Sequence, residues 1–307
     1  MKYQPLFHFT KMFASSSKVV LAEDNESIAK LLLLILEDHN FETKWVFLGN
    51  KVISTCLEKI PDLIILDPIL PDKEGFELLK EIKSHIILSE IPIILILDEE
   101  KQKGRFLHFS PLDILVKPVN LNELSLKIKN WVGVLENQKT LKKKAMTDAL
   151  TGLLNDLALE KELTIACYYA EKFGKNFSTL MIDIDYFTKY NNIYGHRFGD
   201  SLLQTLAVFW KGALRPTDAI FRYKGPSFVA ILQDTPLEQG INAAERLRRI
   251  TYERSLPHQQ GLNNVVTISI GVTAFKKGDT PGIILHRAAS YLTKAKKSGR
   301  NVVKSGI

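Results

Sequence analysis

The sequence predicts an α/β protein, with a doubly wound parallel-sheet domain followed by a second α/β domain. From Lys18 to Trp131, short β-rich runs alternate with helical patterns, as in a parallel sheet with helices on both faces. A second alternation of strands and helices follows a charged stretch at 132–147. The chain has 307 residues, which is long enough for two domains that each bury a core.

Five strands are expected in the first half, each a short run rich in β-branched or other apolar residues. They are predicted at 18–22, 43–47, 62–66, 92–97 and 113–116, with helices that include 26–38 and 75–84. The charged stretch that follows has apolar residues at Val132, Leu135, Leu141 and Ala145, which suits a helical connector.

The second half is expected to contain strands near 177–183, 218–223, 227–233 and 264–274. Its stretch FRYKGPSFVAIL, from Phe221 to Leu232, has alternating apolar residues on either side of a Gly-Pro pair, which predicts a hairpin with a tight turn. The predicted organisation is a disordered leader at 1–17, a first domain at 18–131, a helical linker at 132–147 and a second domain at 148–307.

The composition favours a cytoplasmic protein with acidic partners. A net charge of +7 favours nucleotides, whereas DNA binding has weak support because the dense basic run Lys139–Ala145 suits a solvated linker. Membrane insertion is not expected, because no apolar run approaches the roughly 18–20 residues that span a bilayer and the N-terminus makes a poor signal peptide. Cys56 and Cys167 form no metal or disulfide pattern, as expected of core thiols in a reducing compartment.

Charged residues follow three strands of the first predicted sheet. Glu23 and Asp24 follow the first strand, Asp67 the third and Lys117 the fifth, and ligands gather at the carboxyl ends of parallel strands. Three carboxylates together repel one another unless a cation such as Mg²⁺ neutralises them. Asp67 could then attack a phosphoryl group, and Lys117 could stabilise the resulting charge.

The stretches VVLAED, LIILDPILPDKEG and DILVKP resemble the receiver domain of bacterial response regulators over about 115 residues. The resemblance implies phosphorylation of Asp67 by a sensor histidine kinase, with Mg²⁺ held by Glu23 and Asp24 beside Asp67. Leu97 stands where the family has Ser or Thr, and Ile114 where it usually has an aromatic residue. Two interpretations stay open: a phosphorylatable receiver, and a silent receiver that serves only as an interaction module.

Five stretches of the second half follow one another in a fixed order: TDALTGLLN, LMIDIDYFTKYNNIYGHRFGDSLLQTLA, RYKGPSF, VTISIGVT and AKKSGRN. Together they resemble the GGDEF domain of diguanylate cyclases. Diguanylate cyclases join two GTP molecules into cyclic di-GMP. The resemblance implies a vestigial GTP site, with Asp183 at a metal position, Asn191 and Asp200 at guanine positions, and Lys296 and Arg300 at phosphate positions. Lys296 and Arg300 are expected on one face of the last helix.

The predicted hairpin departs from the family's Gly-Gly-Asp/Glu-Glu-Phe motif. Lys224, Gly225, Pro226, Ser227 and Phe228 stand at its five positions. Pro226 and Ser227 offer no carboxylate to a metal ion, and Thr188 and Asn192 are further departures from the family. No catalytic residue is therefore assigned, no cofactor is expected to support catalysis in this domain, and the chain is predicted not to be an enzyme. One alternative is that Lys224 replaces the charge of the metal.

The stretch LRPTDAIFRY resembles the inhibitory-site motif of the family, an Arg-x-x-Asp before the hairpin. Arg215 and Asp218 form this motif, and Arg246 matches a second arginine of the site. The resemblance implies binding of cyclic di-GMP, because a guanidinium fork can pair with guanine or phosphate.

These observations predict a response regulator in which a non-catalytic GGDEF domain senses cyclic di-GMP or GTP. The chain is expected to form a homodimer and to act on an unidentified downstream protein. A weakly active diguanylate cyclase and an interaction module that binds no nucleotide are the alternatives.

Overall fold

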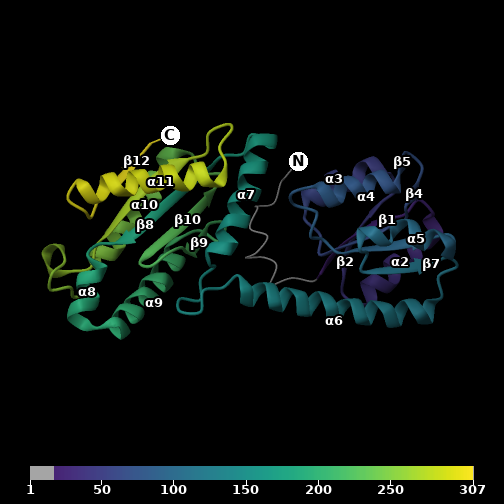
Figure 1. The fold of residues 1–307 in the computed structure, drawn as a ribbon, viewed down its shortest axis with the longest axis horizontal. Helices are drawn as coiled ribbons and strands as arrows, with labels where there is room; N and C mark the ends of the chain where they lie inside the picture. The colour runs from purple at the N-terminus through teal and green to yellow at the C-terminus, as the bar shows by residue number, and fades with distance from the viewer. Residues whose placement is uncertain (1–16, 307) are drawn as a thin grey trace. The chain divides into compact units, whose positions relative to one another are not determined.

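The computed structural model describes residues 17–306 and divides into two compact units, one ending at Leu141 and the other beginning at Lys142 (Figure 1). The disordered leader predicted at 1–17 lies outside the described residues except for Ser17. Each unit has its own five-stranded sheet.

The first unit is a parallel sheet with the strand order β2-β1-β3-β6-β7. Its strands are short and mostly apolar, and β3 and β6 are buried throughout, as in a parallel sheet covered on both faces. They are β1 (Lys18–Ala22), β2 (Glu42–Val46), β3 (Leu63–Leu66), β6 (Ile93–Leu97) and β7 (Asp113–Val116). The predicted doubly wound sheet is confirmed.

Helices connect the strands of the first unit. They are α2 (Glu26–Asp38), α3 (Gly49–Glu58), α4 (Gly75–Ser84) and the short α5 (Lys103–Phe106), and β4 (Ile69–Leu70) and β5 (Lys73–Glu74) form a small antiparallel pair. The strand order changes direction between β1 and β3, so the ends of these two strands border the crevice in which ligands of such sheets bind.

A single helix, α6 (Leu121–Ala145), begins after β7 and contains the residues predicted as a connector. No proline interrupts it, and Leu124, Ile128, Trp131 and Leu135 are buried at helical spacing in the core of the first unit. The helix predicted at 132–147 is therefore the last part of a longer helix.

The second unit has a mixed sheet with the strand order β12-β11-β8-β10-β9, in which only β11 and β12 pair in parallel. The central strand, β8, is buried along its whole length. The strands are β8 (Phe177–Ile184), β9 (Ala219–Arg222), β10 (Ser227–Gln233), β11 (Ile268–Ala274) and β12 (Val303–Ser305). The predicted hairpin is present as β9 and β10, whereas β12 was not predicted.

Five helices complete the second unit: α7 (Asp156–Phe173), α8 (Phe187–Tyr194), α9 (His196–Ala213), α10 (Leu237–Glu253) and α11 (Pro281–Lys297). Trp210 of α9 and Phe228 of β10 are fully buried and meet edge to face, with 4.9 Å between ring centroids. Aromatic pairs of this kind add to the stability gained by burial. Phe228 therefore anchors the start of β10, directly beside the hairpin turn.

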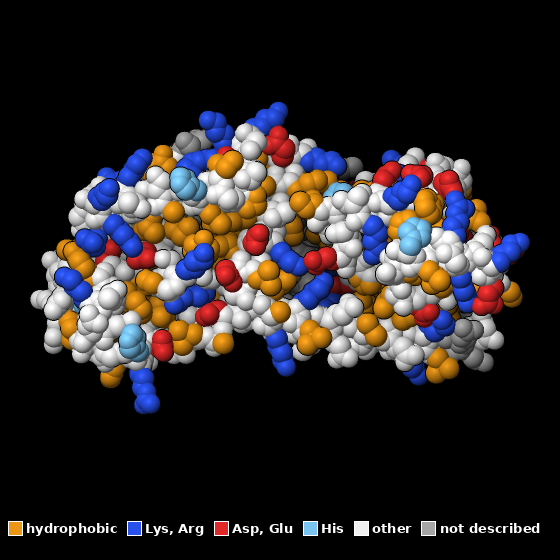
Figure 2. Space-filling view, in the orientation of Figure 1, with side chains coloured by type: hydrophobic (Ala, Val, Ile, Leu, Met, Phe, Trp, Pro, Cys, Tyr) orange, Lys and Arg blue, Asp and Glu red, His pale blue; other side chains and the backbone are white. Residues whose placement is uncertain are grey.

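Lys and Arg side chains are spread among Asp and Glu over the face shown in Figure 2. Within the described part of the chain, no helix combines the length and the apolar character needed to cross a membrane. Cys56 and Cys167 are buried free thiols in α3 and α7, and burial raises the pKa of each to about 12, as expected of inert core residues.

Candidate functional site

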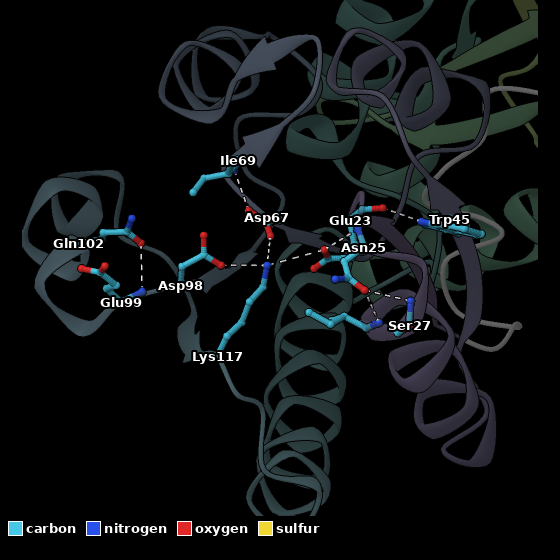
Figure 3. A network of polar contacts seen from close by, with 11 residues as sticks. Glu23, Asn25, Ser27, Trp45, Asp67, Ile69, Asp98, Glu99, Gln102 and Lys117 are labelled. Carbon is cyan, nitrogen blue, oxygen red and sulfur yellow. Dashed lines mark hydrogen bonds and ion pairs between the residues drawn. The ribbon is translucent and has the colours of Figure 1, made fainter.

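A cluster of acidic side chains, which we call the acidic pocket, lies at the carboxyl ends of the strands of the first unit (Figure 3). Glu23 and Asp67 directly follow β1 and β3, and both are buried. One carboxylate oxygen from each of Glu23, Asp24 and Asp67 lies within 4.8 Å of the other two. The three predicted acids are therefore brought together, as the parallel sheet requires.

Lys117, which follows β7, places its ammonium group among these acids. Its Nζ lies 2.5 Å from Asp67 Oδ2, 3.1 Å from Asp98 Oδ1 and 3.8 Å from Glu23 Oε1. Asp98 was not predicted as a site residue. Its position directly after β6, where the other strand ends already carried charged residues, could have revealed it.

Backbone groups hold the two buried carboxylates. The amide of Ile69 donates to Asp67 Oδ1 at 2.7 Å, and the amide of Asn25 donates to Glu23 Oε1 at 3.0 Å. The side chain of Asn25 in turn caps the first turn of α2. Trp45 Nε1 donates to the Glu23 carbonyl at 2.8 Å, so this indole contacts the backbone of the pocket.

The pocket favours binding of a cation. Burial, together with the charge of Asp67, raises the pKa of Glu23 to about 7, and Glu23 Oε2 is buried without a hydrogen-bond partner. Burial opposes the charge of Lys117, but the hydrogen bond and charge of Asp67 outweigh this effect and raise its pKa. A divalent ion with oxygen ligands fits these residues, because it would neutralise the acids and pair with Oε2.

The two departures from the receiver pattern have different surroundings. Leu97, the last residue of β6, is fully buried, and its side chain offers no hydrogen-bond donor to a phosphoryl group. Ile114 lies in β7 and is half-buried.

A second candidate site surrounds Asp183, near the end of β8. Ser227, the first residue of β10, pairs with Asp183 in the sheet, and its Oγ donates to Asp183 Oδ2 at 2.6 Å. Lys296 Nζ lies 2.6 Å from the other oxygen, Oδ1. Both oxygens of this buried carboxylate therefore have partners within the protein.

The residues around Asp183 do not fit the metal site that the family resemblance implies. In the described part of the chain, no group of three acidic, histidine or cysteine ligands includes Asp183. Lys296 supplies the cation next to Asp183, whereas Lys224 is exposed, with its Nζ 5.2 Å from the ring centroid of Tyr223. The structure thus gives no support to Lys224 as a replacement for the metal.

A buried acid that sequence reasoning missed, Asp185, organises the loop after α11. It accepts hydrogen bonds from Thr267 Oγ1 at 2.8 Å, Ser269 Oγ at 2.7 Å and the amide of Asn301 at 3.0 Å. The neighbouring Arg300 is thereby held in place. The second acid of the stretch IDID was the sequence feature that could have identified this residue.

Arg300 lies outside α11, so the prediction that it shares a helix face with Lys296 is wrong. The helix ends at Lys297, and Gly299 and Arg300 have φ values of 104° and 64°, in a turn where glycine is favoured. Arg300 Nη1 donates to the hydroxyl of Tyr186 at 3.2 Å, and its Cζ lies 4.2 Å from the ring centroid. Lys189 Nζ lies 4.9 Å from the same centroid, so two cations contact one aromatic ring.

The two predicted guanine positions lie on neighbouring helices. Asn191 of α8 has a buried Oδ1 with no hydrogen-bond partner, which is a candidate acceptor for a ligand. A side chain on Gly199 of α9 would overlap this oxygen, so the close approach of the two helices requires glycine there. Asp200 is the next residue along α9 and is exposed.

The predicted inhibitory-type residues form a third cluster. The amide of Arg215 donates to Asp218 Oδ2 at 3.0 Å, and Asp218 Oδ1 is buried without a partner. Burial raises the pKa of Asp218, although the nearby charges of Arg215 and Arg246 act in the opposite direction. Arg246 Nη2 donates to the carbonyl of Ala213 at 2.9 Å, and Arg246 lies close enough to Asp218 for its charge to act on that carboxyl.

The acidic residues of the first unit and the Asp183 site of the second unit thus lie in two separate α/β domains, each with its own sheet. Residues 19–129 match the model of the response regulator receiver domain, and residues 145–302 match that of the diguanylate cyclase GGDEF domain. The chain therefore belongs to the GGDEF family and is a response regulator with a receiver domain.

Known proteins are similar to long stretches of the chain. Response regulator PleD of Caulobacter vibrioides is 33% identical over 255 residues, which cover 79% of this chain and 56% of PleD. Diguanylate cyclase DgcP of Pseudomonas aeruginosa is 34% identical over 203 residues, covering 66% of this chain and 28% of DgcP. The chain thus spans about half the length of PleD and less of DgcP.

Two solved structures resemble the part of the chain that contains the GGDEF domain. The coiled coil and GGDEF domain of DgcB from Caulobacter crescentus, in complex with c-di-GMP, has a TM-score of 0.54 and 27% identity, covering 60% of this chain and 98% of that one. Diguanylate cyclase SiaD of Pseudomonas aeruginosa, in complex with its activator SiaC, has a TM-score of 0.52 and 28% identity, covering 61% and 72%.

These similarities correct one prediction. The chain was predicted not to be an enzyme, but its family and its similarity to PleD and DgcP point to an enzyme of the diguanylate cyclase type. That prediction rested on the two missing carboxylates of the hairpin. It gave the departures in the hairpin more weight than the match of residues 145–302 to the diguanylate cyclase family.

Proposed function

We propose that this chain is a response regulator that accepts a phosphoryl group on Asp67 from a sensor histidine kinase and thereby controls the synthesis of cyclic di-GMP from GTP. The observation that carries the proposal is the ion pair between Lys117 and Asp67, within a set of acids that fits Mg²⁺. The similarity of the second domain to diguanylate cyclases supports the synthesis of cyclic di-GMP as the controlled reaction.

The receiver residues have separate roles in phosphoryl transfer. An oxygen of Asp67 attacks phosphorus, a new P–O bond forms, and the leaving group departs with the electrons of the bond that breaks. The amide of Ile69 fixes one oxygen of Asp67, while Lys117 neutralises charge at the other. Glu23 and Asp24 would hold Mg²⁺, which supplies further neutralisation of the phosphoryl oxygens.

The cationic residues of the GGDEF domain would bind the negatively charged phosphates of GTP. Lys296, Arg300 and Lys189 supply positive charge near Asp183, and Asn191 offers an unpaired acceptor to a guanine amino group. Asp200 lies one residue after the glycine that contacts Asn191 and could accept from the same base. Joining two GTP molecules requires two such sites facing each other, so we propose that the active form is a homodimer.

The Arg215 cluster supports a second function, the binding of cyclic di-GMP. Asp218 Oδ1 is buried without a hydrogen-bond partner, and the charges of Arg215 and Arg246 act on this carboxyl. A guanine edge could satisfy the oxygen while the guanidinium groups pair with phosphate. Binding there would allow the nucleotide to act on a downstream protein through this domain.

Incubation with GTP and Mg²⁺, followed by chromatography of the nucleotides, tests the proposed reaction. Cyclic di-GMP is expected to form, and Asp183→Asn should lower its rate because Lys296 and Ser227 lose their charged partner. The absence of product from the intact chain, with and without a phosphodonor, would contradict the proposal.

A further inference from the structure

Lys117 is shared between two carboxylates that lie on different strand ends. Its ammonium group contacts Asp67 after β3 and Asp98 after β6 (Figure 3), at 2.5 Å and 3.1 Å. The Lys117 side chain is mostly buried, with 19% of its surface exposed, whereas the Asp98 side chain is 44% exposed. The position of the ammonium is therefore set by a buried acid on one side and a partly hydrated acid on the other.

A phosphoryl group on Asp67 would depend strongly on Lys117. The neighbouring position at the end of β6 is Leu97, which is fully buried and cannot donate a hydrogen bond. Phosphorylation also replaces a singly charged carboxylate with a group that carries about two negative charges. The phosphoryl group on Asp67 therefore attracts the Lys117 ammonium more strongly than the free carboxylate did. Asp98 continues to attract the ammonium from the other side.

We propose that Asp98 is a positioning residue that competes with the phosphoryl group for the ammonium of Lys117. This inference rests on the proposed acceptance of phosphate at Asp67. In the unphosphorylated chain, Asp98 stabilises Lys117 in its observed position. In the phosphorylated chain, Lys117 moves towards the phosphoryl oxygens and gives up its contact with Asp98, whose carboxylate then faces water.

The competition makes Asp98 a determinant of how much of the chain is phosphorylated. Its negative charge disfavours the more highly charged phosphorylated state, and its contact with Lys117 must weaken as that state forms. Both effects act in the same direction. Asp98→Asn keeps the size and an acceptor oxygen of the side chain but removes the charge, so it should favour the phosphorylated state.

Titration of the full chain with beryllofluoride, a phosphoryl analogue, in saturating Mg²⁺ tests this inference. Trp45 contacts Glu23 and provides a fluorescence signal, which a Trp45→Phe variant identifies. Asp98→Asn is expected to bind beryllofluoride about two- to fivefold more tightly, the effect of one partly exposed ion pair. Its affinity for Mg²⁺ alone should not rise, because the substitution removes a negative charge near the cation, whereas a general change of the fold would move both affinities in the same direction.

Glu100→Gln is the matched control, because Glu100 is exposed, belongs to the same loop and pairs with Lys103 instead. Equal effects of the two substitutions, or no effect of Asp98→Asn, would overturn the inference while leaving phosphate acceptance intact. In a Lys117→Gln background, Asp98→Asn should have a smaller effect than in the unsubstituted chain, because only the repulsion by the Asp98 charge remains. Failure of the unsubstituted chain to bind beryllofluoride would overturn both the inference and the proposed function.

Discussion

The acidic pocket of the receiver domain and the Asp183 site of the GGDEF domain carry opposite balances of charge. In the first, Glu23, Asp67 and Asp98 surround the single ammonium of Lys117. In the second, one carboxylate contacts Lys296, and further cations lie at Tyr186 nearby. An excess of carboxylates favours the binding of a metal ion, whereas an excess of cationic side chains favours the binding of nucleotide phosphates.

This difference in charge explains why acidic residues favour a metal ion at one site more than at the other. Glu23 keeps a buried oxygen without a hydrogen-bond partner, so a bound cation would give that oxygen a partner. Both oxygens of Asp183 already accept from Lys296 and Ser227, so a metal would have to displace an existing partner. The unpaired oxygen of the receiver pocket thus favours a cation, whereas the cations near Asp183 favour an anion.

The largest expected effect comes from removing the phosphoryl acceptor. Asp67→Asn should abolish phosphoryl incorporation from a small phosphodonor, because no other carboxylate has both the Lys117 contact and the amide of Ile69. Mass spectrometry of the intact chain measures the incorporation. Asp38→Asn, at the exposed end of α2, serves as the control and should incorporate normally. Equal incorporation into Asp67→Asn would show that the acceptor lies elsewhere.

Adding acids to the GGDEF site would make it resemble the receiver pocket. Pro226→Asp with Ser227→Glu should raise the rate of cyclic di-GMP formation by roughly 100- to 1000-fold, the usual effect of one well-placed electrostatic group. The rate is measured by chromatography after incubation with GTP and Mg²⁺. Pro226→Ala removes the ring without adding charge and should have little effect. An unchanged rate in the double variant would mean that the hairpin does not limit the reaction.

A substitution in the Arg215 cluster should have a smaller effect, on the binding of cyclic di-GMP. Arg215→Ala should weaken cyclic di-GMP binding by roughly 10- to 100-fold, as expected for the loss of a charge-assisted hydrogen bond. Calorimetric titration measures the change. Arg249→Ala is the control, since Arg249 is an exposed arginine of α10. If both variants bind as the intact chain does, the nucleotide does not use this cluster.

The pH dependence of Mg²⁺ binding tests the charge balance of the receiver pocket. The pKa of Glu23 is raised from 4.5 to about 7, so the free energy of unfolding without Mg²⁺ should fall as the pH rises through this interval. Mg²⁺ requires the ionised form, so its affinity should rise over the same interval, by up to about tenfold per pH unit. Calorimetry at several pH values measures this rise. It should be much smaller in Glu23→Gln, and an equal rise there would contradict the assignment.

The sequence predicted the fold well because local patterns determine most of it. Apolar runs such as LIIL and IILIL, separated by helical patterns, specify a parallel sheet, and α2 and α4 have the predicted limits. The strand β12 was missed because its three residues carry no periodic pattern. The length of α6 was missed because the change from buried to charged positions suggested a boundary where the backbone continues as a helix.

The sites were predicted unevenly for a related reason. Residues at strand ends, such as Glu23, Asp67 and Lys117, follow directly from the topology of a parallel sheet. Asp98 and Asp185 each carry a sequence signal, a strand end for Asp98 and a second acid beside Asp183 for Asp185, but the contacts that give them their roles come from distant elements. The contact between Lys296 and Asp183 likewise depends on tertiary packing, and no spacing in the sequence specifies it.

The rate of cyclic di-GMP formation from GTP by the intact chain, with and without beryllofluoride, tests most directly whether the two sites are coupled. The account predicts that the product forms and that beryllofluoride raises the rate, with no increase in Asp67→Asn. Equal rates in the presence and absence of the phosphoryl analogue, when its binding has been verified by fluorescence, would contradict the account.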